Sequence, residues 1–75
     1  MDDDSLTVET YAGYKGEPTP RAFICEGLRR EVTRVADTWY TDRHYYFRLS
    51  ADDGHCYVVR YELDRDRWEL AMQEH

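Results

Sequence analysis

The part of the chain that most constrains the fold is the stretch 44–72, where bulky apolar residues alternate with polar ones. The runs 44–50, 56–63 and 68–72 are rich in aromatic and β-branched residues, which suit a pleated, half-buried surface. Gly54 follows a pair of aspartates between the first two runs and supplies the positive φ that a tight hairpin turn demands. The pattern predicts three antiparallel strands joined by short turns.

The first forty residues predict further strands separated by turns. Alternation over 6–11 and the short run 21–26 each favour a strand. The segment 13–20 contains both prolines of the chain and is expected to be a loop, because proline cannot donate to a central ladder. Segment 28–40 is rich in Val, Thr, Trp and Tyr, which favours a long strand bent near Asp37. Its apolar residues also recur at helical spacings, so a helix is the alternative.

Together these segments predict a single all-β domain over residues 6–72, with frayed ends at 1–5 and 73–75. About six antiparallel strands in meander order are expected to form a small SH3-like or open barrel, with the first and last strands as exposed edges. The last strand is expected to turn Met72 inward. The predicted core consists of Phe23, Trp39, Tyr45, Phe47, Val59, Tyr61, Trp68 and Leu70.

The charge of the chain limits its partners. The formal net charge is −6, which argues against a partner bound by bulk negative charge, such as duplex DNA or an anionic membrane. A basic surplus occurs only in segment 21–48, which contains six arginines against four acids. The acidic start of the chain is unlike a secretory signal peptide, and no apolar run approaches the ~20 residues that span a bilayer. We therefore expect a cytoplasmic protein that does not contact a membrane.

The residues that could support catalysis or bind a metal do not form a recognisable set. Cys25 or Cys56 could act with His44 or His55, because a thiolate needs a neighbouring cation, but nothing in the sequence brings such a pair together. The short-spaced cysteines of a zinc site and the terminal Glu of a calcium loop are missing, so Asp53 is interpreted as part of the turn alone. The sequence predicts a non-enzymatic protein without cofactor or metal, whose two thiols are reduced and mostly buried.

A stripe of aromatic and basic residues on the outward side of the predicted strands is the candidate binding surface. The stripe consists of His44, Tyr46, Arg48 and Arg60, and it could be extended by Arg29, Arg30 and Arg34. Tyr, Trp and Arg are enriched at interface hot spots, which favours a protein partner or a second copy of the chain. The same residue types can stack on bases and contact phosphates, so binding of single-stranded nucleic acid is the alternative. Glu31 and Glu62 could instead pair with these arginines on a solvated face.

Turn glycines, core aromatics and strand valines recur in a characteristic order between residues 20 and 72. The pattern is Pro20-x-x-Phe23-x-x-x-Gly27, Val32 and Val35 before Trp39, Tyr46-Phe47-Arg48, Asp53-Gly54, Tyr57 and Trp68-Glu69-Leu70. It resembles a group of short prokaryotic domains of unknown function. The resemblance implies an all-β fold without an established catalytic motif. Because some members of that group accompany components of error-prone DNA repair polymerases, it also implies a DNA repair context for the nucleic-acid alternative.

Overall fold

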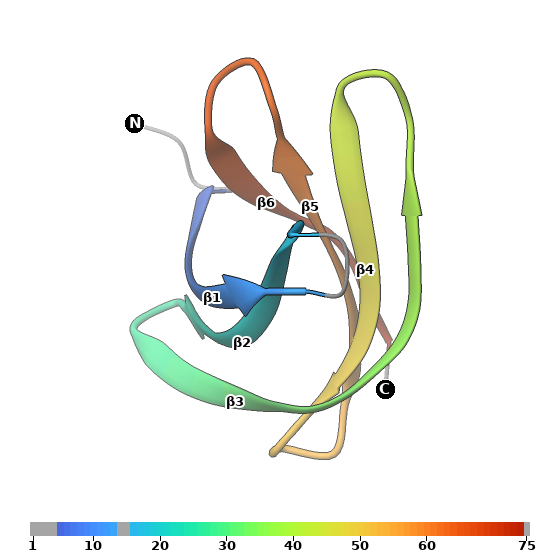
Figure 1. Cartoon of the computed structure of the whole chain (residues 1–75). Coiled ribbons are helices and arrows are strands. Elements are labelled where there is room, and N and C mark those ends of the chain that lie inside the picture. The colour runs from blue at the N-terminus through green and yellow to red at the C-terminus, as the bar shows by residue number, and fades with distance from the viewer. Residues whose placement is uncertain (1–4, 14–15, 75) are drawn as a thin grey trace.

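The computed structural model describes residues 5–13 and 16–74, and all their regular secondary structure is β-strand (Figure 1). The strands are β1 (Ser5–Ala12), β2 (Pro18–Cys25), β3 (Leu28–Tyr40), β4 (His44–Ala51), β5 (Cys56–Glu62) and β6 (Arg67–Glu74). Each strand pairs with the next, and β6 pairs with β1, so the sheet closes into a barrel in meander order. The predicted all-β fold is thereby confirmed. Residues 1–4 and 75, which belong to the predicted frayed ends, lie outside the described residues.

Short turns with positive φ join neighbouring strands. Glu26 and Gly27, with φ of 53° and 81°, form the two-residue turn between β2 and β3, and positive φ at both positions matches the twist of a hairpin. Gly54, with φ of 83°, lies in the turn between β4 and β5, where its N–H donates to the Ala51 carbonyl at 3.0 Å. These turns fix the antiparallel register of the strands that they join.

β3 connects the two halves of the barrel. Its first residues, 28–31, pair with β2, and its remainder pairs with β4, so the strand sweeps along the bottom of Figure 1 and then rises beside β4. The register shifts between Val32 and Arg34 and again between Val35 and Asp37. Such irregularities bend a strand and increase its twist. The long bent strand is confirmed, and the helical alternative is wrong.

The first and last strands pair with each other, contrary to the prediction that they are exposed edges. Ser5 lies opposite Glu69, and Leu6 lies opposite Trp68. An open edge lies instead where β3 leaves β2, because among the described residues β3 pairs with β4 alone from position 32 onward.

Both prolines lie in β2 rather than in the predicted loop. Pro18 and Pro20 lie opposite Ala12 and Thr10 of β1, whereas the pairing of β2 with β3 extends only to Ala22. Within the described part of the chain, the start of β2 therefore has a strand partner on one side only. Proline is tolerated in such a position, because the missing N–H is not needed for a ladder on the open side.

The barrel is filled by side chains from β2, β4, β5 and β6. The buried apolar residues are Ala22, Phe23, Phe47, Leu49, Ala51, Tyr57, Val59 and Trp68. Phe23 meets Tyr57 edge to face with ring centroids 5.1 Å apart, and Phe47 packs on Trp68 at 5.7 Å. The other residues predicted to lie in the core, apart from Trp39, are half-buried and pack against this cluster: Tyr45, Tyr61 and Leu70.

Two residues predicted to point inward are exposed, and register shifts explain both. Trp39 is 42% exposed, because β3 changes phase before it and places it opposite Tyr46 on the outward side. Met72 is 53% exposed. The pairing of β5 with β6 shifts so that Leu70 lies opposite Val59 whereas Met72 lies opposite Val58, which reverses the alternation expected for the last strand.

Candidate functional site

Four of the predicted surface residues lie together on the outward side of β4 and β5, beside Trp39 of β3. The register places Trp39 opposite Tyr46 and Tyr46 opposite Arg60. His44 and Arg48 share the outward side of β4 with Tyr46, because alternate residues of a strand face the same way. We call these five residues the aromatic face. Trp39 is the member that the sequence pattern wrongly assigns to the core.

The Trp39 and Tyr46 rings are stacked on the surface. Their centroids are 5.3 Å apart, with an angle of 1° between the ring planes, and the His44 ring lies 5.8 Å from Tyr46. Val58 and Met72 lie on the same side of the sheet and extend its apolar area. A ring pair held by two strands offers rigid contact area, because Trp and Tyr lose little conformational entropy on binding.

Carboxylates neutralise both arginines of the aromatic face. Arg48 donates to Asp37, its neighbour on β3, and Arg60 Nε donates to Glu69 Oε1 at 2.7 Å. The hydrogen bond from Arg60 lowers the pKa of Glu69, so this carboxylate is ionised at neutral pH. The face therefore presents paired charges rather than a basic track.

The three arginines predicted to extend the surface lie in different surroundings. Arg29 donates to Glu9 at 2.9 Å across β2. Arg30 lies 3.5 Å from Asp53 inside a pocket. Arg34 lines a separate groove between β2 and β3. The three arginines therefore lie in an ion pair, a pocket and a groove, and do not form one continuous basic surface.

Three side chains of metal-binding type lie close together, and one of them belongs to the aromatic face. The ligand atoms of His44, Glu62 and Glu69 lie within 4.8 Å of one another. Arg60 lies 2.7 Å from one Glu69 oxygen and Arg67 lies 3.7 Å from the other, so both oxygens already face a cation. These guanidinium groups would repel a metal ion. We interpret the group as part of an ion-pair network.

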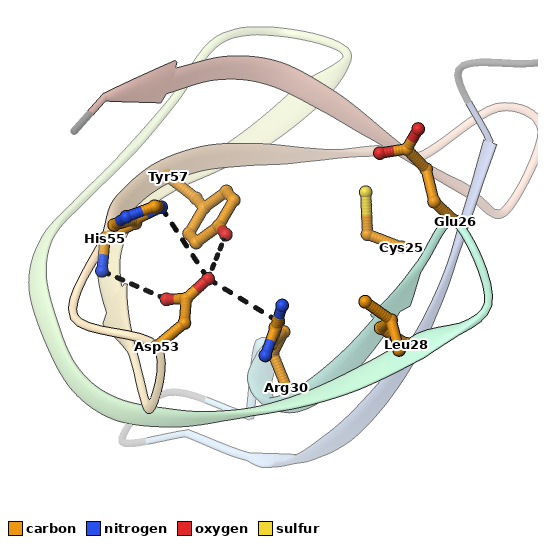
Figure 2. Close-up of a pocket in the computed structure, with 7 residues that line it drawn as sticks. All are labelled: Cys25, Glu26, Leu28, Arg30, Asp53, His55 and Tyr57. Carbon is orange, nitrogen blue, oxygen red and sulfur yellow. Dashed lines mark hydrogen bonds and ion pairs between the residues drawn. The ribbon is translucent and has the colours of Figure 1, made fainter.

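A small pocket lies beside the β4–β5 turn (Figure 2), and the sequence pattern assigns its central carboxylate to the turn alone. The lining residues are Cys25, Glu26, Leu28, Arg30, Asp53, His55 and Tyr57. The Asp53 side chain is 12% exposed. It accepts hydrogen bonds from the Tyr57 hydroxyl at 2.5 Å and from the His55 backbone N–H at 3.0 Å. The spacing Asp53-x-His55-x-Tyr57 is the signal that could have found this cluster, because it places all three residues at alternate positions.

The contacts of Asp53 move two pKa values in opposite directions. The hydrogen bonds from Tyr57 and from the His55 N–H lower the pKa of Asp53. Burial, together with the hydrogen bond to Asp53, raises the pKa of Tyr57 to about 12. At neutral pH the pair is therefore a carboxylate and a neutral phenol, joined by a charge-assisted hydrogen bond. This bond ties the turn to β5.

The pocket does not activate its thiol. Burial and the neighbouring Glu26 raise the pKa of Cys25, whereas a nucleophilic thiol needs a lowered pKa. Figure 2 shows Cys25 and Glu26 on one side of the pocket and Asp53 with His55 on the other. The pocket encloses about 190 Å³, which is below the ~300 Å³ at which most small-molecule sites begin. We interpret the polar cluster as structural.

Cys56 is exposed, contrary to the prediction that both thiols are mostly buried. It precedes Tyr57, whose ring faces the core, so strand alternation turns Cys56 outward. Cys25 is half-buried, and both cysteines are free thiols.

Comparison of the chain with protein-family models, with curated proteins and with solved structures found no match. The resemblance to short prokaryotic domains therefore stays a prediction. The described part of the chain contains no helix that could cross a membrane.

Proposed function

We propose that this protein is a non-enzymatic interaction module that binds a protein partner, or a second copy of itself, through the aromatic face. The observation that supports this proposal best is the exposed, parallel stack of Trp39 on Tyr46, whose ring centroids are 5.3 Å apart. A small barrel has little apolar surface to bury and gains stability by burying its rings. A tryptophan left 42% exposed is therefore better explained by a partner than by packing.

The composition of the face matches that of energetically important interface residues. Trp, Tyr and Arg are the residue types most enriched among hot spots. Burying a whole aromatic side chain removes roughly 150–250 Å² from water, and a partner that covers the 42% of Trp39 still exposed would remove the corresponding share. The ion pairs Arg48–Asp37 and Arg60–Glu69 flank the stack and form a polar rim of the kind that surrounds an apolar interface centre.

The contacts inside the pocket of Figure 2 argue against catalysis there. The pKa of Cys25 is raised, so this thiol is protonated and a poor nucleophile at neutral pH. The Asp53 carboxylate is already engaged by Tyr57 and Arg30, which occupies the group that would otherwise act as a base. These features support the non-enzymatic part of the proposal.

Photocrosslinking tests the proposal in cells that produce the protein. Benzoylphenylalanine in place of Trp39 is expected to form an adduct with one protein or with a second copy of the chain. The matched control carries the same group in place of Asp52, which is exposed in the β4–β5 turn. Light scattering on the purified protein separates self-association from a foreign partner. The proposal fails if position 39 yields no adduct beyond that seen at position 52.

Binding of single-stranded nucleic acid is the second candidate, and the Trp39–Tyr46 stack is the observation that favours it. Exposed aromatic rings can stack on bases, and base stacking contributes about 1–3 kcal/mol per base. The neutralised Arg48 and Arg60 weaken the case, because phosphates would have to compete with Asp37 and Glu69. Fluorescence anisotropy with oligothymidylate at low and moderate salt decides it, since phosphate contacts weaken as salt rises. An absence of binding at low salt rules this function out.

A further inference from the structure

We infer that the groove between β2 and β3 binds an extended acidic peptide segment. The groove measures about 340 Å³, and its lining residues are Tyr11, Pro20, Arg21, Val32, Thr33, Arg34 and Val35. It lies where β3 turns away from β2 toward β4. The inference goes beyond the function proposed above and does not depend on it, because the groove shares no residue with the aromatic face.

The groove contains two arginines that form no ion pair with a carboxylate among the described residues. In residues 5–13 and 16–74, ion pairs with carboxylates are formed by Arg29, Arg30, Arg43, Arg48, Arg60, Arg65 and Arg67. Arg21 and Arg34 are exposed and form no such pair within these residues, although Arg21 acts on Glu9 at longer range and helps to lower its pKa. The chain has 16 acids against 10 basic residues, so cations without a paired acid are unexpected on its surface. That both line one groove makes it a local site for carboxylates.

The backbone beside the groove can accept an added strand. Ala22 and Glu31 are the last opposed residues of β2 and β3. Beyond them, among the described residues, β2 pairs with β1 only and β3 pairs with β4 only. A strand edge without a partner can pair with an extended peptide. Pro20 has no N–H to offer, so β3 is the strand expected to form the ladder.

The side chains of the groove suit a peptide that alternates acidic and apolar residues. Val32 and Val35 are half-buried and provide an apolar floor. Tyr11 is 49% exposed and stands at its margin. In an extended peptide, successive side chains point to opposite sides, so apolar residues could face the valines while carboxylates reach Arg21 and Arg34. Guanidinium groups bind carboxylates through two parallel hydrogen bonds.

The charge of the whole protein favours a short acidic segment over a nucleic acid. A net charge of −6 repels a long polyanion, whose affinity depends on several phosphate contacts at once. A peptide needs only a carboxylate for each of the two arginines and gains backbone hydrogen bonds that a nucleic acid cannot make. The observations therefore favour the peptide.

Fluorescence anisotropy at low ionic strength tests the inference with a labelled synthetic peptide in which glutamate alternates with valine. A matched peptide with glutamine in place of glutamate, and labelled oligothymidylate, are the comparison probes. We expect the glutamate peptide to bind and to shift the amide NMR signals of Thr33, Arg34 and Val35. Arg21→Gln and Arg34→Gln should each weaken binding about threefold, and the double variant about tenfold, as for exposed ion pairs.

The control variant is Arg43→Gln, which changes the net charge equally but removes an arginine paired with Asp64 in a distant turn. It should bind the glutamate peptide as the wild type does. The inference is overturned if the glutamate peptide does not bind, or if the glutamine peptide binds as tightly. Equal weakening by Arg43→Gln, NMR shifts confined to other strands, or tighter binding of oligothymidylate at the same amides would overturn it as well.

Discussion

Asp53 holds the β4–β5 turn against the barrel, because its carboxylate accepts a hydrogen bond from the Tyr57 hydroxyl at 2.5 Å. Tyr57 is only 5% exposed, so this bond is shielded from water. The Asp53-Gly54 pair predicts the turn, because the conformational preference of a turn is local. The partner of Asp53 could not be predicted in the same way, since it depends on how the turn folds back onto β5.

We predict that Tyr57→Phe lowers the free energy of unfolding by about 1 kcal/mol, because it removes the hydrogen bond to Asp53. The raised pKa of Tyr57, about 12, also makes this phenol titrate after ordinary tyrosines near 10. The fold favours the neutral phenol, so its contribution to stability is complete below about pH 10 and is lost as pH rises toward the folded pKa.

Urea unfolding and phenolate absorbance measure these two effects. The variant should lose the last component of the alkaline titration that the wild type shows. Unchanged stability together with an unchanged titration would show that the Asp53–Tyr57 contact is not formed.

Phe47 tests the assignment of the core. It is fully buried and packs on Trp68 with ring centroids 5.7 Å apart. We predict that Phe47→Ala lowers the free energy of unfolding by about 3–5 kcal/mol, through lost burial and the cavity that remains. Leu28, which is 58% exposed, is the control, and Leu28→Ala should change stability by less than about 0.5 kcal/mol. Similar denaturation midpoints for the two variants would refute the assignment.

At the scale of the elements, β3 is the strand that departs most from a regular ladder. It exchanges one partner for another along its length, and its register shifts let Val32 and Val35 both face the core despite a spacing of three. This spacing is what makes the segment resemble a helix in the sequence. The β-branched residues of this segment correctly predict a strand. The positions of its register shifts follow from closing the barrel, so they cannot be predicted from local alternation.

Hydrogen exchange measures the consequence of this arrangement. β5 pairs with β4 and β6 along its whole length, whereas β3 beyond position 32 has one partner among the described residues. We predict that the slowest amides lie in β5, and that amides of β3 between Arg34 and Tyr40 on the open side exchange much faster, because they need only local opening. Uniform protection of both strands in the free protein would show that this edge is covered.

The contrast between local alternation along a strand and the register shifts of β3 also explains how much of the candidate site could be predicted. His44, Tyr46 and Arg48 alternate on one strand, so the sequence correctly places them on one side. Trp39 is missed because its phase depends on the β3 shifts. Arg30 is separated from the predicted stripe because it faces Asp53, a partner brought close by the β4–β5 turn.

At the scale of the whole molecule, hydrogen bonds to carboxylates make the stability of the fold depend on pH. Lowered pKa values occur at acids held by hydrogen-bond donors: Glu9 by Arg29, Asp53 by Tyr57 and Glu69 by Arg60. A carboxyl group with a lowered folded pKa stabilises the fold above its unfolded pKa, near 4, and loses that contribution as pH falls through the folded value. We predict that the melting temperature declines steadily below about pH 4. Circular dichroism melts across this range measure it, and a constant or rising melting temperature would contradict the network.

The most direct test of the account is Trp39→Ala, measured for both stability and binding. Because Trp39 lies outside the core, its loss should remove about 0.2–1 kcal/mol of cross-strand stabilisation from Tyr46 and lower the melting temperature by about 8 °C or less. Its loss from the aromatic face should weaken binding to the crosslinked partner, or self-association, by about 2 kcal/mol or more, roughly thirtyfold. Unchanged affinity, with or without a large drop in melting temperature, would contradict the claim that this face is the binding surface.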